Sequence, residues 1–213
     1  MEILLASQNR HKLEELRRVL GGSVHQWVLP QDLRRQRGAA LAPPPVPIED
    51  QPDYFGNAFA KARDFSRWAG LPALADDSGL EVDALNGRPG VRSARFAGEG
   101  ASSAANLARL LDELRGVPDA HRGARFVCQL VLARGDEVLF DTRATCEGRV
   151  VHSACGEHGF GYDPVFVPNG ETRTFAEMSS MEKDRISHRG KALAGLAEAL
   201  ASGRPFEPRA SHP

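Results

Sequence analysis

The most constraining stretch of the chain is a short apolar run followed at once by two carboxylates. Residues 71–75 have the length and bounding signals of a buried strand, and Asp76 and Asp77 follow directly. Ligands of open α/β sheets bind beyond the carboxyl ends of strands, so we expect a site here, with Gly79 allowing a turn. A carboxylate facing such a site suits a hard cation, which prefers oxygen ligands. In the alternative interpretation, Asp76 and Ser78 only cap a helix.

Composition is ordinary for a soluble globular protein. The 213 residues are 41% apolar and 26% charged, with a formal net charge of −1, so no overall field attracts nucleic acid or an anionic membrane. Cys128, Cys146 and Cys155 are odd in number and lack C-x-x-C spacing, which argues against a disulfide framework or a zinc site. The N-terminal stretch turns polar too early for a signal peptide, and no apolar run has membrane-spanning length. We therefore expect a cytoplasmic protein with no nucleic acid and no membrane as partner.

The order of the predicted elements indicates an α/β or α+β fold with a mixed sheet. A turn at residues 135–136 predicts a hairpin, and Ser102 or Ser103 is expected to begin the preceding helix. Residues 24–47 give little signal beyond an extended connection, and 204–213 form a loose tail after a single domain at 1–203. Strands are expected at 3–6, 71–75, 125–133, 137–141 and 142–151, and helices at 12–20, 53–69, 101–115 and from 183–189 onward.

The loop Ser7–Lys12 joins the first strand to the first helix. A helix N-terminus presents unpaired N–H groups and a positive dipole end, which suit phosphate. Lys12 in the first turn is unfavourable there unless an anion binds. The alternative is a cap by Ser7 or Asn9, with Lys12 in solvent. Only four of the 27 basic residues are lysine, and three of them, Lys12, Lys61 and Lys183, fall in candidate segments.

Three later segments also carry candidate residues. Asn57 and Lys61 share one face of the helix at 53–69, which we expect to point away from the apolar stripe. The glycines of 159–166 let the backbone approach a ligand, and an aromatic ring there offers a platform for a base; the alternative is a tight turn with buried aromatics. Lys183, His188 and Arg189 place cations and hydrogen-bond donors at the start of the last predicted helix. They are unfavourable there without an anionic or acceptor-rich partner.

Together these segments resemble the inosine triphosphate pyrophosphatase family, the non-standard purine nucleoside triphosphate pyrophosphatases. The resemblance runs from about residue 3 to about residue 200, and its motifs occur in the family's order. Its carriers are A-S-Q-N-R-H-K (6–12), N-A-F-A-K-A (57–62), A-L-A-D-D-S-G-L-E-V-D-A-L (73–85), P-G-V-R-S-A-R-F-A-G (89–98), G-F-G-Y-D-P-V-F (159–166) and I-S-H-R-G-K-A-L (186–193).

The resemblance implies a fold and an activity. The fold is α/β, an elongated mixed β-sheet flanked by helices, with two lobes and a central nucleotide cleft, and the protein is expected to be a homodimer. The activity is Mg²⁺-dependent hydrolysis of ITP, dITP and XTP to the monophosphate and pyrophosphate, which removes them from the nucleotide pool. The substrate partner is thus a purine nucleoside triphosphate.

The resemblance also implies residue roles. Asp77, Asp76 and Lys61 are the implied catalytic residues, with Asp77 as general base, and Glu49 and Asp77 are the implied Mg²⁺ ligands. The implied contacts to triphosphate and base are Ser7, Gln8, Asn9, Arg10, His11, Lys12, Ser78, Phe160, Gly161, Tyr162, Asp163, Lys183, His188 and Arg189.

The sequence departs from the family pattern at three places. Gln8 replaces a small residue, Gly56 replaces an acidic one, and the second metal carboxylate is either Glu49 or Asp50. Two other classes of function remain open. One is a Maf-like nucleotide pyrophosphatase that prefers pyrimidine or modified nucleotides, and the other is a nucleotide-binding module without catalysis.

Overall fold

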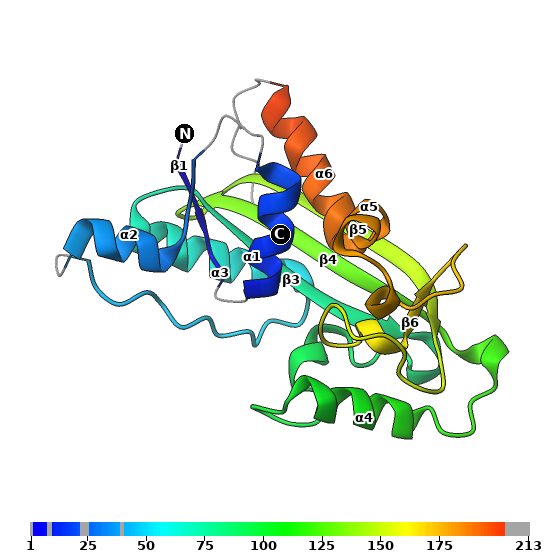
Figure 1. Ribbon diagram of the computed structural model, residues 1–213. Coiled ribbons are helices and arrows are strands. Elements are labelled where there is room, and N and C mark those ends of the chain that lie inside the picture. The colour runs from blue at the N-terminus through cyan, green and yellow to red at the C-terminus, as the bar shows by residue number, and fades with distance from the viewer. Residues whose placement is uncertain (1, 8–9, 22–25, 39–40, 203–213) are drawn as a thin grey trace. The chain divides into compact units, whose positions relative to one another are not determined.

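The computed structural model describes residues 2–7, 10–21, 26–38 and 41–202, and Figure 1 labels its helices and strands. The strands are β1 (Glu2–Leu5), β2 (Gln26–Val28), β3 (Ala73–Val82), β4 (Gly123–Arg134), β5 (Glu137–Val150) and β6 (Phe166–Pro168). The α-helices are α1 (Arg10–Leu20), α2 (Pro30–Arg37), α3 (Tyr54–Ala69), α4 (Ser103–Glu113), α5 (Ser180–Ile186) and α6 (His188–Ala201). Short 3₁₀ helices occur at Asp83–Leu85, Gly90–Arg95, Asp119–His121, Asp163–Val165 and Phe175–Glu177. None of the described helices combines the length and the apolar content needed to cross a membrane.

The strands form one mixed sheet in the order β2-β1-β3-β4-β5-β6. β1 pairs in parallel with both β2 and β3, whereas β5 pairs antiparallel with β6. β4 and β5 are neighbours joined at Gly135, whose φ of 57° is in the left-handed region that favours glycine. The predicted α/β class, mixed sheet and hairpin are confirmed. The central nucleotide cleft stays a prediction.

The chain divides into two compact units. Unit 1 consists of Met1–Asp77, Gln129–Arg143 and Ala192–Pro213, and unit 2 of Ser78–Cys128 and Ala144–Lys191. Each unit has its own hydrophobic core. The core of unit 1 consists mainly of residues of β1, β2, α2, α3, β3, β4 and β5. In the core of unit 2, Leu110 of α4 lies in one cluster with the aromatic side chains of Phe126, Phe166 and Phe175. The prediction of a single domain at 1–203 stays a prediction, and its tail at 204–213 lies outside the described residues.

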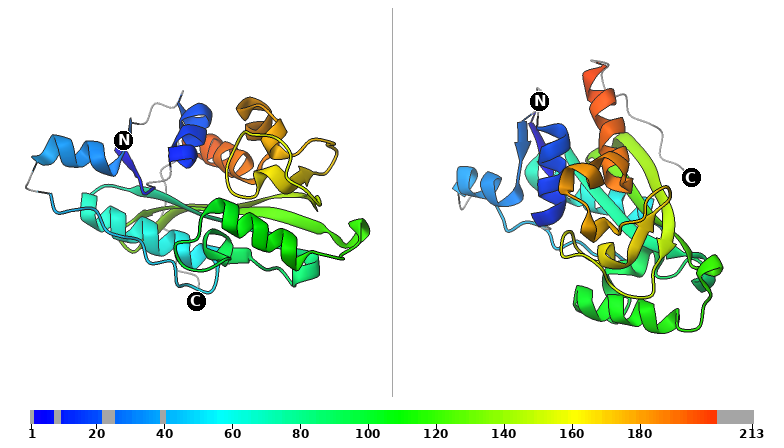
Figure 2. Two further views of the ribbon diagram at one scale, coloured as in Figure 1. Left: turned by 60° about the horizontal axis from the view of Figure 1, so that its bottom comes forward. Right: turned by 45° about the vertical axis from the view of Figure 1, so that its right-hand side comes forward.

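In unit 1, helices cover both faces of the sheet. Figure 2 shows α1 and α3 on opposite sides of the first strands. Leu13 and Leu16 of α1 are buried, as are Ala58, Ala62 and Phe65 of α3. Successive side chains of a strand point to opposite faces, so neighbouring residues of β3 can meet different helices.

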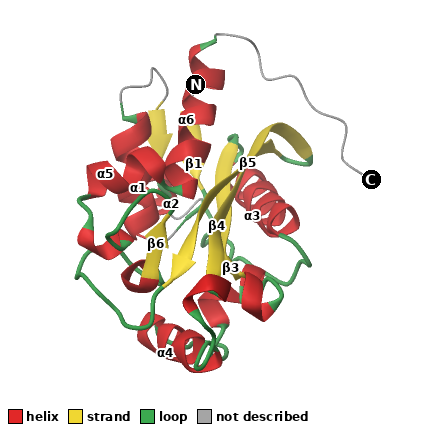
Figure 3. Cartoon of the chain, turned by 90° about the vertical axis from the view of Figure 1, so that its right-hand side faces the viewer, coloured by secondary structure: helices red, strands yellow, loops and turns green. Residues whose placement is uncertain are grey.

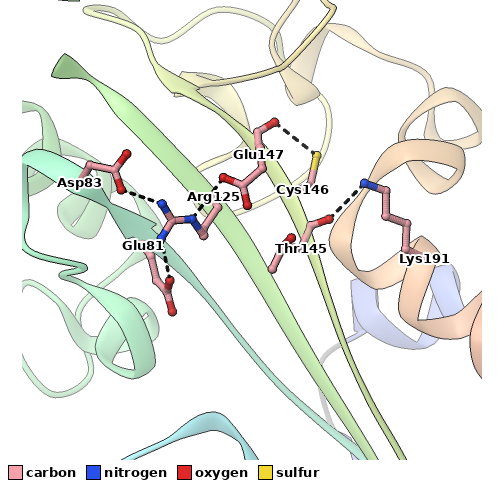
Figure 4. A network of polar contacts seen from close by, with 7 residues as sticks. All are labelled: Glu81, Asp83, Arg125, Thr145, Cys146, Glu147 and Lys191. Carbon is pink, nitrogen blue, oxygen red and sulfur yellow. Dashed lines mark hydrogen bonds and ion pairs between the residues drawn. The ribbon is translucent and has the colours of Figure 1, made fainter. Parts of the chain in front are cut away.

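Unit 2 contains more irregular chain. In Figure 3 most of the chain around β6 is drawn as loop. On β4, Arg125 contacts Asp83 at 2.7 Å, Glu147 at 3.2 Å and Glu81 at 3.4 Å, as Figure 4 shows. These contacts link β4 to its neighbours β3 and β5.

Two expectations about the elements are wrong, and one segment that gave little signal forms regular structure. β3 continues to Val82 instead of ending before Asp76, because Leu80 and Val82 extend its buried residues and Gly79 makes no turn. Residues 26–37 form β2 and α2, where pairing with β1 and burial of Leu33 supply a stability that local sequence does not reveal. Lys183 lies on a separate helix, α5, because Ser187 is extended and its hydroxyl accepts from Gly190 N–H at the start of α6.

Ser102, not Ser103, caps α4, and this cap can be tested. The Ser102 side chain accepts a hydrogen bond from Ala105 N–H at 3.2 Å. Ser102→Ala is therefore expected to lower the free energy of unfolding by about 1 kcal/mol. Ser103→Ala is the control and should change it much less, since alanine is the better helix former. Urea unfolding of both variants measures the difference, and equal losses would contradict the assignment.

Candidate active site

β3 carries Asp76 and Asp77 into the interior of unit 1, where each meets a different helix. Asp76 Oδ2 lies 2.7 Å from Lys12 Nζ on α1. Asp77 Oδ2 accepts a hydrogen bond of 3.0 Å from Asn57 Nδ2 on α3. Both carboxylates are buried. They lie within β3 and not at its end.

The face of α3 that carries Asn57 and Lys61 points inward. Asn57 is 1% exposed and Lys61 8% exposed. Lys61 Nζ donates to Glu49 Oε1 at 2.5 Å and to the backbone oxygen of Asp76 at 3.1 Å. Buried polar groups are stable when such partners satisfy them, and here the partners are the acids themselves.

Burial and nearby charges have opposite effects on the pKa values of the residues in this cluster. Burial raises the pKa of Asp77 to about 6, against the opposing effects of the Asn57 hydrogen bond and the Lys61 charge. Burial also acts to raise the pKa of Glu49, but the charge and hydrogen bond of Lys61 outweigh it and lower that pKa. Burial acts to lower the pKa of Lys61, and Asp76 and Glu49 overcome it, so that pKa is raised. A carboxyl group with a pKa near neutrality suits proton transfer.

The donor atoms of this cluster fit a hard divalent cation. Carboxylate oxygens are what Mg²⁺ prefers, and proteins commonly bind it through one or two carboxylates plus substrate phosphates. Glu49 and Asp77 are two such groups, whereas Asp50 is exposed and accepts from the Gln51 side chain at 2.8 Å. In the described part of the chain, no three His, Cys, Asp or Glu side chains are grouped to hold an ion by themselves.

In unit 2, a second group of predicted residues gathers around Asp163. Its carboxylate accepts hydrogen bonds from Phe160 N–H at 2.8 Å and from Lys183 Nζ at 2.7 Å. Asp163 and Lys183 are both buried. Gly159 has a φ of 75°, and a Cβ there would lie 2.1 Å from Asp163 Oδ2. Because Gly159 has no Cβ, the Asp163 carboxylate can lie close enough to this loop to accept the hydrogen bond from Phe160 N–H.

Cations lie over the ring of Phe160. Lys183 Nζ is 4.9 Å from its centroid, and the guanidinium of Arg189 is 5.7 Å from it. Arg189 also donates to Ser78 Oγ at 3.2 Å. The His188 ring stacks on Phe126, with centroids 4.7 Å apart and planes at 8°. This group of residues in unit 2 therefore combines an aromatic face with several hydrogen-bond donors.

The remaining predicted residues differ in how far the structure describes them. Tyr162 is buried and its hydroxyl donates to Ser93 O at 2.9 Å, so it anchors the loop of Phe160. Ser7 is half-buried just before α1, and Gly161 has a φ of 64°. Gln8 and Asn9 lie outside the described residues. Arg10 and His11 are described only as backbone of α1.

Sequence reasoning gave no role to two residues that contact the predicted ones. Asn57 lies in a quoted motif, on the face expected to point away from the apolar stripe, but it has no predicted role. Phe126 lies in the predicted strand at 125–133, which carries no functional motif. Only the spatial contacts of Asn57 with Asp77 and of Phe126 with His188 reveal them.

The fold and this site define an α/β protein in which two buried aspartates of the mixed sheet lie next to lysines of the flanking helices. More narrowly, the chain belongs to the Ham1 family, whose sequence model matches residues 3–199. The dITP/XTP pyrophosphatase of Mycobacterium tuberculosis H37Rv is 48% identical over 203 residues, which cover 94% of this chain and 96% of that protein.

Solved structures of the family have the same fold. A HAM1 protein from Coxiella burnetii matches with a TM-score of 0.84 and 36% identity, over 95% of this chain and all of that one (100%). A nucleoside-triphosphatase, dITP/XTP pyrophosphatase, from Mycobacterium abscessus matches with a TM-score of 0.72 and 43% identity, over 92% of this chain and 98% of that one.

Proposed function

We propose that the protein is a hydrolase of non-standard purine nucleoside triphosphates, which it converts to the monophosphate and pyrophosphate. The observation that carries this proposal is the convergence in unit 1 of buried Lys61, Asp76 and Asp77 with half-buried Lys12 and Glu49. Relatives that are 43% to 48% identical over nearly the whole chain are named dITP/XTP pyrophosphatases, which supports the same substrate class here.

In this proposal, a water molecule attacks the α-phosphorus in line with the bond to the β-phosphate. Water supplies the oxygen that joins the monophosphate, its proton passes to Asp77, and pyrophosphate leaves with the bridging oxygen. Lys12 and Lys61 stabilise the charge that builds up on the leaving group. Bound at Glu49 and Asp77, Mg²⁺ would neutralise phosphate charge and acidify water.

We assign recognition of the base to residues of unit 2. Phe160 offers its ring as a stacking surface, and His188 and Arg189 carry donors suited to the O6 acceptor of hypoxanthine or xanthine. Adenine has an amino group at that position, which would leave buried donors unpaired, and a site that depends on hydrogen bonds discriminates strongly against such an analogue. Homodimerisation, cytoplasmic location and removal of these nucleotides from the pool stay predictions.

A panel of triphosphates tests this function. Pyrophosphate release should show kcat/KM values for ITP, dITP and XTP that exceed the value for ATP by up to about 10⁴, and release should require Mg²⁺. Equal rates on ATP would refute the recognition of the base. A preference for pyrimidine or modified nucleotides would favour the Maf-like alternative. Binding of nucleotide without Mg²⁺-dependent release would favour a non-catalytic module.

A further inference from the structure

The amide group of Asn57 bridges two parts of the candidate site. Its Nδ2 donates to Asp77 Oδ2 at 3.0 Å, and its Oδ1 accepts from Gln51 N–H at 3.0 Å. The residue is 1% exposed. It is thus held at both ends of its amide, in the interior of unit 1.

The chemistry of the partners fixes which way this amide points. The backbone N–H of Gln51 can only donate a hydrogen bond, so the atom that faces it must be the amide oxygen. The NH₂ group is then directed at Asp77, which accepts from it as a carboxylate. A flipped amide would place its NH₂ group against the Gln51 N–H donor and its oxygen against the Asp77 carboxylate. Neither pair can form a hydrogen bond, so only one orientation is stable.

The same face of α3 also holds the second acidic group. Lys61, one turn after Asn57, binds Glu49 through Nζ at 2.5 Å. Gln51, which Asn57 holds through its backbone, is two residues after Glu49 in the chain. Asn57 therefore restrains both Asp77 and the segment that carries Glu49.

We propose that Asn57 is a positioning residue that holds Asp77 and the Glu49 segment in place for a divalent cation. This inference depends on the proposed function only for the assignment of Glu49 and Asp77 as cation ligands. Asn57 acts through Asp77 and not on the substrate. Partners of this kind orient a ligand carboxylate, and their loss commonly weakens metal affinity by about 10- to 100-fold.

Asn106 in unit 2 offers a matched control. It is 5% exposed, its Oδ1 accepts from Ala97 N–H at 2.7 Å, and its Nδ2 donates to Ala94 O at 3.0 Å. It therefore bridges two groups as Asn57 does, but both of its partners are backbone atoms. Replacing it removes the same number of buried hydrogen bonds without touching a carboxylate.

The experiment measures Mn²⁺ binding to the full chain without nucleotide, by calorimetry, with Mn²⁺ as the probe for the cation site. Asn57→Leu, of similar size and without polar atoms, should raise the Kd for Mn²⁺ by about 10-fold or more. Asn106→Leu should leave that Kd within about twofold of the wild type, although thermal unfolding should show both variants destabilised. Where Asn57→Leu does not fold, Asn57→Ala takes its place.

A double-mutant cycle then separates positioning from general destabilisation. In an Asp77→Asn background, Asn57→Ala should raise the Kd for Mn²⁺ by a smaller factor than it does in the wild type, because the carboxylate that Asn57 holds directly is gone and only the Glu49 segment is still restrained. An unchanged Kd in Asn57→Leu, an equal loss in Asn106→Leu, or no Mn²⁺ binding by the wild type would each overturn the inference. Failure of pyrophosphate release with an intact Asn57 effect on Mn²⁺ would refute only the proposed function.

Discussion

Asp77→Asn is expected to lower the turnover number for ITP by about two orders of magnitude or more, because one substitution removes a cation ligand and a proton acceptor. The substitution is isosteric, and the new amide oxygen can still accept the hydrogen bond from Asn57 Nδ2 that Asp77 Oδ2 accepts at 3.0 Å. The fold should therefore be kept, and the loss should appear in kcat. Steady-state pyrophosphate release at saturating ITP and Mg²⁺ measures it.

The matched control for this variant is Asp136→Asn, also in unit 1. Asp136 contacts Arg67 at 2.5 Å at the hairpin turn, and its side chain is 70% exposed. Exposed ion pairs contribute little to stability, so this variant should keep its activity. Turnover of Asp77→Asn close to that of the wild type would remove Asp77 from the mechanism.

Lys61→Met is expected to lower kcat by about 10²-fold or more, because it removes a positive charge that stabilises the leaving pyrophosphate. Methionine keeps most of the buried aliphatic stem of Lys61, so the packing of α3 is largely retained. Lys61→Arg should restore only part of the turnover, because a planar guanidinium cannot occupy the position of a compact ammonium group between Glu49 Oε1 and Asp76 O.

Lys191→Met is the control for the loss of a lysine. Lys191 lies on α6 and donates to the backbone oxygen of Thr145 at 3.1 Å, as Figure 4 shows. Thr145 belongs to neither group of candidate residues. Replacement of Lys191 should therefore leave kcat within about threefold of the wild type. If Lys61→Met and Lys191→Met had the same modest effect, Lys61 would have no special part in the reaction.

The elements that local sequence predicted well are those with strong local signals. The helix at 53–69 begins at Tyr54 because Asp53 accepts from Gly56 N–H at 2.7 Å, and it ends at Gly70, which adopts a left-handed conformation. The hairpin at 135–136 follows in the same way from a glycine with positive φ. Caps and turns act over a few residues, so the sequence carries their full signal.

The elements that were missed depend on distant partners. β2 is three residues long, from Gln26 to Val28, and it is a strand because it pairs in parallel with β1. Local sequence gives no role to Phe126, because its stacking partner, His188, is 62 residues away in sequence. Such contacts leave no periodic trace in a single sequence.

By itself, the sequence determined the α/β class, the strong helices and the hairpin, and the set of acids, lysines and aromatics that make up the candidate site. Only the tertiary structure decided that Asp76 and Asp77 lie inside a strand and that Asn57 and Lys61 point inward. The physical reason is that a buried charge is stable only beside its partner. Lys12 meets Asp76, Lys61 meets Glu49, and Lys183 meets Asp163 only after the chain has folded.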